Sequence, residues 1–272
     1  MSFIVITDLD GTLLDHLTYD YAPALPALHE LKRQGVPVVF CSSKTAAEII
    51  PLRREMEIGD PFIVENGGGA YIPEGYFPPR KHPNSGYRKD GFQVMPLGRP
   101  YAELLATLNE IGEELDFEFQ HFKEFSPEEI SARMGLSVQE ARRAQVRDFD
   151  LPFTIEGTAT DLKALEEAVR QRGLRLFRGG RFFHLTGDHD KGTAARLLVD
   201  LLSAQEIEPG QSIGLGDSQN DLSLLRVVDL PIRIPNPHSA AALSSEIPRL
   251  RTAPAPGPAG WNAAVLAIIG VQ

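Results

Sequence analysis

Short apolar runs alternate with helical patterns along the first third of the chain. The apolar run Phe3–Ile6 predicts a buried strand, and Ala22–Gln34 carries leucines at helical spacing before Gly35, a typical helix stop. The same alternation then predicts a strand at Pro37–Cys41, a helix at Thr45–Met56 and a strand at Phe62–Val64. Strands that alternate with helices at this spacing favour a parallel sheet with right-handed crossovers.

The middle of the chain follows a different pattern. Residues Pro73–Gly98 are rich in proline and glycine and show little periodicity, so they are expected to be irregular. Two helix starts are then predicted, because Ser126 with Glu129 and Ser137 with Glu140 each fit a capping box. Downstream, the pattern predicts a strand, a helix and a hairpin: Phe153–Glu156, Thr160–Arg172, and Leu174–Arg178 with Arg181–Thr186 around Gly179-Gly180.

The last third returns to the first pattern. Helices are predicted at Lys191–Leu202, Leu222–Val228 and Trp261–Ile269, and strands at Ser212–Leu215 and Pro231–Ile234. The simplest architecture is therefore discontinuous. Residues 1–83 and 188–272 are expected to form one doubly wound core domain, and residues 84–187 an inserted α/β domain.

Composition and charge narrow the class of protein. The net charge of −10 disfavours binding to nucleic acid or to an anionic membrane surface. Cys41 is the only cysteine, so an intramolecular disulfide is excluded, in agreement with a reducing compartment. The first apolar run is too short for a signal peptide, and no run approaches the ~20 apolar residues that span a bilayer. We expect a cytoplasmic protein without nucleic-acid or membrane partners.

The strongest chemical signal is the run Asp8-Leu9-Asp10-Gly11-Thr12, which directly follows the first predicted strand. Ligands of open parallel sheets bind beyond the carboxyl ends of the strands. Two carboxylates at positions i and i+2 enter one loop there, and they require a cation or a shared proton. The alternative interpretation is an ordinary Asp/Gly turn that caps a helix.

Three further segments lie at equivalent places, and each has an ordinary alternative. Asp217 and Asp221 in the run Gly216–Asp221 offer oxygen ligands to Mg²⁺, or they cap the next helix. Lys191 begins a helix, where the helix dipole disfavours a cation, so it indicates a nearby anion unless it is a surface lysine. Ser42-Ser43-Lys44-Thr45 joins a strand to its helix, which fits either an anion site or a helix N-cap.

A doubly wound sheet would bring all four segments to one edge. In this order they resemble the motifs of the haloacid dehalogenase superfamily of phosphotransferases: D-x-D-G-T, a serine, a lysine, and then G-D-x-x-N-D. The stretch between Glu65-Asn66-Gly67 and Asp190-Lys191-Gly192 looks like the α/β cap of its Cof-type branch. The expected fold class is therefore α/β, with a doubly wound (Rossmann-like) parallel-sheet core and an inserted α/β cap domain.

The resemblance implies a phosphatase that works through an aspartyl-phosphate. Asp8 would be the nucleophile and Asp10 the general acid and base. Lys191 and Ser42 would be the other catalytic residues, offsetting charge and donating to a phosphate oxygen. Mg²⁺ would be the cofactor, and its implied binding residues are Asp8, Asp10, Asp217 and Asp221. Four aspartates and a phosphate would repel one another, so the residue list itself also indicates strong metal dependence.

Within that branch, further segments resemble the phosphatases of sugar phosphoglycerates: Ser42–Thr45, Glu65–Gly69, Arg178–His184 and Pro256–Asn262. They imply a small-molecule sugar phosphate as the substrate. The implied substrate-binding residues are Leu9, Thr12, Ser43, Lys44, Asn66, Gly67, Arg178, Gly179 and Arg181. Arg178 and Arg181 flank the predicted Gly-Gly turn, where two guanidinium groups suit the glycerate carboxylate. The alternative is a solvated hairpin end that is rich in arginine.

The residues leave other functions open. One is a phosphatase of a hexose or sucrose phosphate, and another is a phosphomutase that reuses the aspartyl-phosphate. Release of inorganic phosphate without an activating bisphosphate separates a phosphatase from a mutase. A third possibility is a non-catalytic sensor of sugar phosphates, but binding alone does not need a nucleophile beside an acid/base. The oligomeric state is expected to be monomer or homodimer.

Overall fold

The computed structural model describes residues 3–78, 86–155, 159–179, 181–204, 210–237 and 247–270. The chain divides into two compact units. The core unit comprises Met1–Ser42, Ile58–Met95 and Asp190–Gln272, and the cap unit comprises Ser43–Glu57 and Pro96–His189. The insertion of one α/β unit into another agrees with the predicted fold class.

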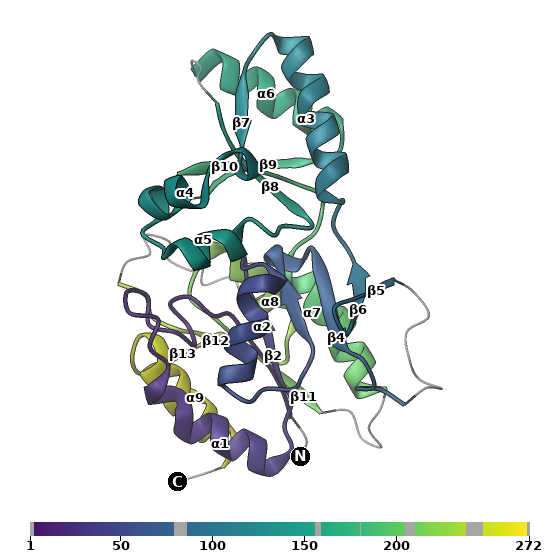
Figure 1. The fold of residues 1–272 in the computed structure, drawn as a ribbon. Helices are drawn as coiled ribbons and strands as arrows, with labels where there is room; N and C mark the ends of the chain where they lie inside the picture. The colour runs from purple at the N-terminus through teal and green to yellow at the C-terminus, as the bar shows by residue number, and fades with distance from the viewer. Residues whose placement is uncertain are drawn as a thin grey trace. The chain divides into compact units, whose positions relative to one another are not determined.

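A nine-stranded sheet forms the centre of the core unit within the described residues, in the order β13-β12-β11-β1-β2-β3-β4-β6-β5 (Figure 1). Its strands are β1 (Phe3–Thr7), β2 (Val38–Cys41), β3 (Phe62–Val64), β4 (Gly69–Pro73), β5 (Tyr87–Lys89), β6 (Phe92–Pro96), β11 (Gln211–Gly216), β12 (Leu230–Arg233) and β13 (Arg251–Thr252). Strands β13 to β3 are parallel, and β4 turns antiparallel to β3. The chain winds from β1 to β3 in one direction and from β11 to β13 in the other. This confirms the doubly wound core and places the end of β1 at the switch point.

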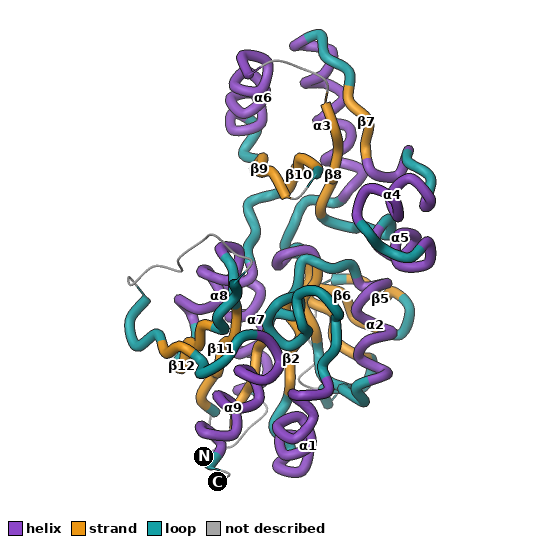
Figure 2. The backbone as a smooth tube through the Cα atoms, turned by 90° about the vertical axis from the view of Figure 1, so that its left-hand side faces the viewer, coloured by secondary structure: helices purple, strands orange, loops and turns teal. Residues whose placement is uncertain are grey.

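Two pairs of helices pack within the core unit. The helices are α1 (Leu25–Gln34), α7 (Lys191–Ser203), α8 (Leu222–Val227) and α9 (Gly257–Ile269). Helix α7 packs against α8, and α9 packs against α1 (Figures 1 and 2). These helices agree with the predicted ones, with two differences at their starts. The turn Ala22–Ala24 is a 3-10 helix, and α9 begins at Gly257 rather than at Trp261.

The prediction of irregular structure over Pro73–Gly98 was wrong for Tyr87–Pro96. Strands β5 and β6 form an antiparallel hairpin in which Lys89 pairs with Phe92. The two residues between them, Asp90 and Gly91, have φ values of 50° and 82°. Positive φ at both positions is the type I′ turn that Asp-Gly favours, so the dipeptide was a signal that we missed. Residues 79–85, including the predicted domain boundary at 83/84, lie outside the described residues, and the boundary at 187/188 stays a prediction.

A smaller sheet organises the cap unit, and its described strands follow the order β7-β8-β10-β9. They are β7 (Phe119–His121), β8 (Asp150–Ile155), β9 (Arg175–Gly179) and β10 (Phe182–Thr186), with helices α2 (Ala46–Glu55), α3 (Tyr101–Leu115), α4 (Pro127–Met134), α5 (Val138–Ala144) and α6 (Ala159–Gln171). The predicted hairpin is confirmed, because Phe182 pairs with Gly179; Gly180 lies outside the described residues. Both predicted capping boxes are present, at Ser126 and at Ser137.

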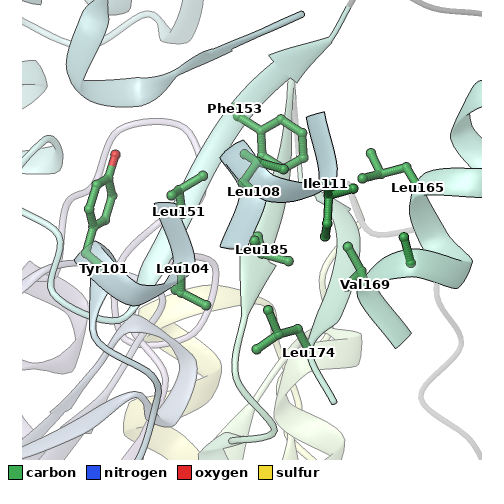
Figure 3. Close-up of a cluster of buried hydrophobic side chains, with 11 residues drawn as sticks. Tyr101, Leu104, Leu108, Ile111, Leu151, Phe153, Leu165, Val169, Leu174 and Leu185 are labelled. Carbon is green, nitrogen blue, oxygen red and sulfur yellow. The ribbon is translucent and has the colours of Figure 1, made fainter. Parts of the chain in front are cut away.

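Helices α3 and α6 pack on the cap sheet through a buried apolar cluster (Figure 3). Leu104, Leu108 and Ile111 of α3 contribute to it at helical spacing. The sequence reasoning missed this helix, because its N-cap residue Pro100 makes no side-chain cap bond and gives no start signal. The apolar spacing alone was the signal that predicts it. No helix in the described parts of the chain is long and apolar enough to cross a membrane.

Candidate active site

Two carboxylates emerge side by side from adjacent strands of the core sheet. Asp8 follows the last residue of β1, and Asp217 follows the last residue of β11. The strands are parallel and in register, with Thr7 paired to Leu215, so both loops leave the same edge of the sheet. The predicted gathering of chemical groups at that edge is therefore present for the first and last motifs.

Lys191 lies between the carboxylates of Asp8 and Asp221. It is the first residue of α7, after Asp190, whose carboxylate caps the helix by accepting from the Thr193 amide at 2.7 Å. The Lys191 Nζ lies 2.6 Å from Oδ1 of Asp8 and 2.6 Å from Oδ1 of Asp221. The anion that a lysine at a helix start predicts is thus a pair of carboxylates. Burial disfavours the ammonium, but Asp221 and Asp8 hold the pKa of Lys191 above its ordinary value.

The carboxylates outnumber the cations in this cluster. One oxygen from each of Asp8, Asp217 and Asp221 lies within 4.8 Å of the others, and all three residues are buried. Burial raises the pKa of Asp8 well above its ordinary value, and the Asp221 charge raises it further, although Lys191 opposes both. Burial also raises the pKa of Asp217. When fully ionised, the three carboxylates and the one ammonium would carry two net negative charges, which a hard divalent cation would neutralise, so this donor set fits such a cation.

Asp217 is held in place by two side chains from distant segments. The Thr12 hydroxyl donates to its Oδ1 over 3.0 Å, and the Asn236 amide donates to its Oδ2 over 2.5 Å. Gly11, with φ of 80°, lets the loop pass close by, because a Cβ there would lie 2.9 Å from Asp217 Oδ2. The sequence reasoning missed Asn236. Its place just beyond the end of β12 was the available signal, since this strand neighbours β11.

Asp221 accepts more hydrogen bonds from the protein than Asp8 or Asp217 does, because one of its oxygens accepts from two backbone amides at once. Its Oδ1 accepts from Lys191, and its Oδ2 accepts from the amides of Asp217 and Ser218 at 3.0 Å each. Asp221 therefore shapes the Asp217 loop and orients Lys191. This arrangement suits a supporting role next to a cation better than a direct ligand.

The loop after β3 packs against the start of α7 and carries two of the predicted residues. The Asn66 amide donates to the Ser42 carbonyl over 2.9 Å, and its side-chain Oδ1 accepts from Asn220 over 3.0 Å. Gly67 has φ of 99°, and a Cβ there would lie 2.1 Å from the Asp190 carbonyl oxygen. Glycine at this position therefore allows the close approach that brings the loop to the helix carrying Lys191.

The other predicted residues occupy several environments. Leu9 and Thr12 are fully buried, and Ser42 is 1% exposed. Asp10 is half-buried, and its backbone forms an isolated β-bridge with Leu14. The remaining predicted residues all belong to the cap unit: Ser43, Lys44, Arg178, Gly179 and Arg181. Both arginines are exposed, and the Arg178 guanidinium lies 5.7 Å from the centre of the Phe183 ring. The roles predicted for these residues stay predictions.

The fold and this cluster define a class of enzyme, and comparison with known proteins agrees with it. A model of the haloacid dehalogenase-like hydrolase family matches residues 5–77. The chain belongs to this family of hydrolases, because full-length relatives share more than a third of its residues. The order of motifs along the sequence predicted the same family.

Relatives that match most of the chain carry more particular names. The chain is 36% identical over 270 residues to a glucosyl-3-phosphoglycerate/mannosyl-3-phosphoglycerate phosphatase of Methanococcoides burtonii, covering 99% of this chain and 98% of that protein. It is 34% identical over 234 residues to a mannosyl-3-phosphoglycerate phosphatase of Pyrococcus furiosus, covering 85% and 90%. A crystal structure of a protein from Thermotoga maritima shares the fold, with a TM-score of 0.67 at 17% identity, covering 100% of this chain and 98% of that one.

Proposed function

We propose that this chain is a phosphatase that hydrolyses the phosphomonoester of a sugar phosphoglycerate, with mannosyl-3-phosphoglycerate giving mannosylglycerate and inorganic phosphate. The observation that carries the proposal is the buried Asp8 carboxylate, which meets Lys191 at 2.6 Å and has two further carboxylates beside it. The sugar phosphoglycerate is supported by the names of the relatives that match nearly the whole chain.

In the first step, the Asp8 carboxylate attacks the phosphorus atom and the bond from phosphorus to the leaving oxygen breaks. Asp10 gives its proton to that oxygen, which departs as an alcohol, and the phosphoryl group remains on Asp8 as an acyl phosphate. In the second step, a water molecule attacks phosphorus while Asp10 takes one of its protons. Inorganic phosphate leaves, and both aspartates return to their starting state.

The carboxylate cluster fits Mg²⁺ as cofactor. Asp8, Asp217 and the backbone carbonyl of Asp10 would hold it, with Asp221 in support. When bound, it would shield the phosphate from the charge of the attacking carboxylate. Lys191 offsets part of the same charge, and the Ser42 hydroxyl would donate to a phosphate oxygen. Thr12 and Asn236 keep the Asp217 carboxylate oriented by their hydrogen bonds.

Substrate choice is assigned to the inserted cap, residues 84–187. Arg178 and Arg181 border the β9–β10 turn and are both exposed, so their guanidinium groups are accessible to a ligand. Two such groups suit the glycerate carboxylate, which simple hexose phosphates lack. The predicted contacts of Leu9, Ser43, Lys44, Asn66, Gly67 and Gly179 with substrate belong to the same proposal. The cytoplasmic location and the state of monomer or homodimer also stay predictions.

The test is release of inorganic phosphate from a panel of substrates by the purified protein and by its Asp8→Asn variant. We expect the highest kcat/KM for mannosyl- or glucosyl-3-phosphoglycerate, without any activating bisphosphate. The variant should retain less than about a thousandth of the activity, a barrier change of ~4 kcal/mol. A preference for hexose or sucrose phosphate would overturn the substrate, and dependence on a bisphosphate would indicate a mutase. An active Asp8→Asn variant would overturn the mechanism.

A further inference from the structure

Two hydrogen bonds connect the indole of Trp261 to the backbone of Asp8. The Nε1–H of Trp261 donates to Oγ1 of Thr7 over 2.9 Å, and this hydroxyl donates to the carbonyl oxygen of Asp8 over 2.7 Å. Trp261 and Thr7 are both fully buried. Because the hydroxyl accepts one bond and donates the other, its rotation is fixed and the two bonds act as one unit.

The hydrogen bond from Thr7 to Asp8 lies at the point where the strand pairing of β1 ends. The parallel pairing of β1 with β11 and with β2 ends at Thr7, one residue before Asp8. The Asp8 amide still donates to the Leu215 carbonyl over 2.9 Å, and the Thr7 hydroxyl engages the carbonyl on the other side. Both backbone groups of Asp8 are thereby tied, which fixes the direction in which its side chain leaves the backbone.

The segment before Trp261 explains how the indole reaches this place. Gly260 packs so tightly that a Cβ there would lie 1.7 Å from the Ala255 carbonyl oxygen, and Gly257 has φ of 56°. The next residue, Asn262, anchors the same helix elsewhere, because its Oδ1 accepts from the Ala27 amide over 2.9 Å. Helix α9 therefore has two polar anchors, one to Thr7 at the end of β1 and one to the start of α1.

We propose that Trp261 is a positioning residue for the Asp8 carboxylate and acts through the Thr7 hydroxyl. The inference rests on the proposed function, in which Asp8 attacks the phosphorus atom. Loss of the indole N–H would free the hydroxyl to rotate and would loosen the Asp8 peptide. The chemical step then slows, because the reacting oxygen is less often aligned with phosphorus. Substrate binding, which does not use this connection, stays the same.

The experiment measures kcat and KM for p-nitrophenyl phosphate in Trp261→Phe, Thr7→Val and Thr7→Ser. We expect Trp261→Phe and Thr7→Val each to lower kcat by about tenfold, the worth of one hydrogen bond in the reacting geometry, with KM within about twofold of wild type. Thr7→Ser keeps the hydroxyl and should keep most of kcat. The double variant Trp261→Phe/Thr7→Val should lose no more than Thr7→Val alone, since both changes break one connection.

Asn262→Ala is the matched control, because it removes the other anchor of the same helix. It should lower the Tm about as much as Trp261→Phe does and leave kcat unchanged, with all rates measured well below each Tm. A wild-type kcat in Trp261→Phe, or an equal loss of kcat in Asn262→Ala, would overturn the inference. If Trp261→Phe does not fold, the comparison of kcat between Thr7→Val and Thr7→Ser tests the inference. Equal kcat values in those two variants would show that the Thr7 hydroxyl does not position Asp8. If these results overturn the positioning role while Asp8→Asn is inactive, the proposed function with Asp8 as nucleophile still holds.

Discussion

The ammonium of Lys191 and the carboxylate of Asp8 lie 2.6 Å apart in the interior of the core unit, although 183 residues separate them in the chain. The same ammonium reaches Asp221 at 2.6 Å, so one cation serves two acids. A buried charge that loses its partner is far more costly than an exposed one. The charge of Lys191 is therefore expected to contribute both to the stability of the core unit and to the charge balance of the site.

Lys191→Gln should damage both stability and activity. Three carboxylates would face one another without their ammonium, so the free energy of unfolding should fall by about 3–5 kcal/mol in the absence of metal. We expect kcat/KM for p-nitrophenyl phosphate to fall by roughly tenfold to a hundredfold or more, since charge-assisted contacts contribute about 1.5–3 kcal/mol. Urea unfolding and phosphate release measure the two effects. Lys163→Gln, at an exposed position on α6, is the control, and equal effects in both variants would reject the role of Lys191.

Asp10→Asn should stop turnover and still permit phosphorylation of Asp8. A carboxamide cannot pass a proton to the leaving oxygen, but a good leaving group needs no acid. With an activated aryl phosphate we expect a burst of phenol and a trapped acyl phosphate on the protein. Mass spectrometry of the acid-quenched enzyme detects it, with Asp8→Asn as the blank. Steady turnover of the sugar phosphoglycerate by Asp10→Asn would contradict the proton-transfer role.

Removal of divalent cations with EDTA should abolish activity, and Mg²⁺ should restore it. Mg²⁺ should also raise the Tm, because binding to the folded state at 100 times Kd contributes about 2.7 kcal/mol. In Asp217→Asn the Mg²⁺ concentration for half-maximal activity should rise at least about tenfold, since one carboxylate ligand is lost. Full activity in a verified metal-free preparation would exclude the proposed cofactor.

Arg181→Ala should matter only for substrates that carry a carboxylate. Loss of a bidentate contact should lower kcat/KM for mannosyl-3-phosphoglycerate by roughly tenfold to a hundredfold, while p-nitrophenyl phosphate is hydrolysed as before. Arg170→Ala is the control, because Arg170 is an exposed arginine of the same unit that pairs with Glu167. Equal losses on both substrates would assign Arg181 to the fold or to the phosphate site instead.

The stability of the cap unit should decrease at low pH, because the carboxylate of Asp150 becomes protonated there. This buried carboxylate meets Arg147 at 2.5 Å and His184 Nδ1 at 2.9 Å. Burial alone would raise the pKa of Asp150, but His184 and Arg147 outweigh it and hold the pKa below its ordinary value. A lowered folded-state pKa means that the contribution is complete above the unfolded pKa of about 4 and is lost as the pH falls through the folded value.

Asp150→Asn tests this dependence by thermal unfolding between pH 6 and about pH 2, the range in which carboxylates titrate. The variant should have a lower Tm than wild type at pH 6, and the difference should shrink as the pH falls. A difference that stays constant with pH would show that the loss comes from packing and hydrogen bonding. Asp116→Asn, an exposed aspartate at the end of α3, serves as the control.

Local chemistry explains which elements the sequence predicted. The capping boxes at Ser126 and Ser137 involve residues three positions apart, so the local sequence is enough to predict them. The Asp90-Gly91 dipeptide also predicts a hairpin turn from local sequence, but it lies in a proline-rich stretch that was interpreted as irregular. Helix α3 lacked a cap and depended on tertiary burial of its apolar face.

The amino-acid sequence alone predicts the family, the places of Asp8 and Asp217 directly after strands, and an anion beside Lys191. These follow from short motifs and from the rule that parallel strands end at one edge. Tertiary packing, in contrast, brings Lys191 to both Asp8 and Asp221, Asn236 to Asp217, and Trp261 to Thr7. These partners lie from 19 to 254 residues apart in the chain. Sequence patterns report periods of a few residues, whereas such contacts depend on how whole strands and helices pack.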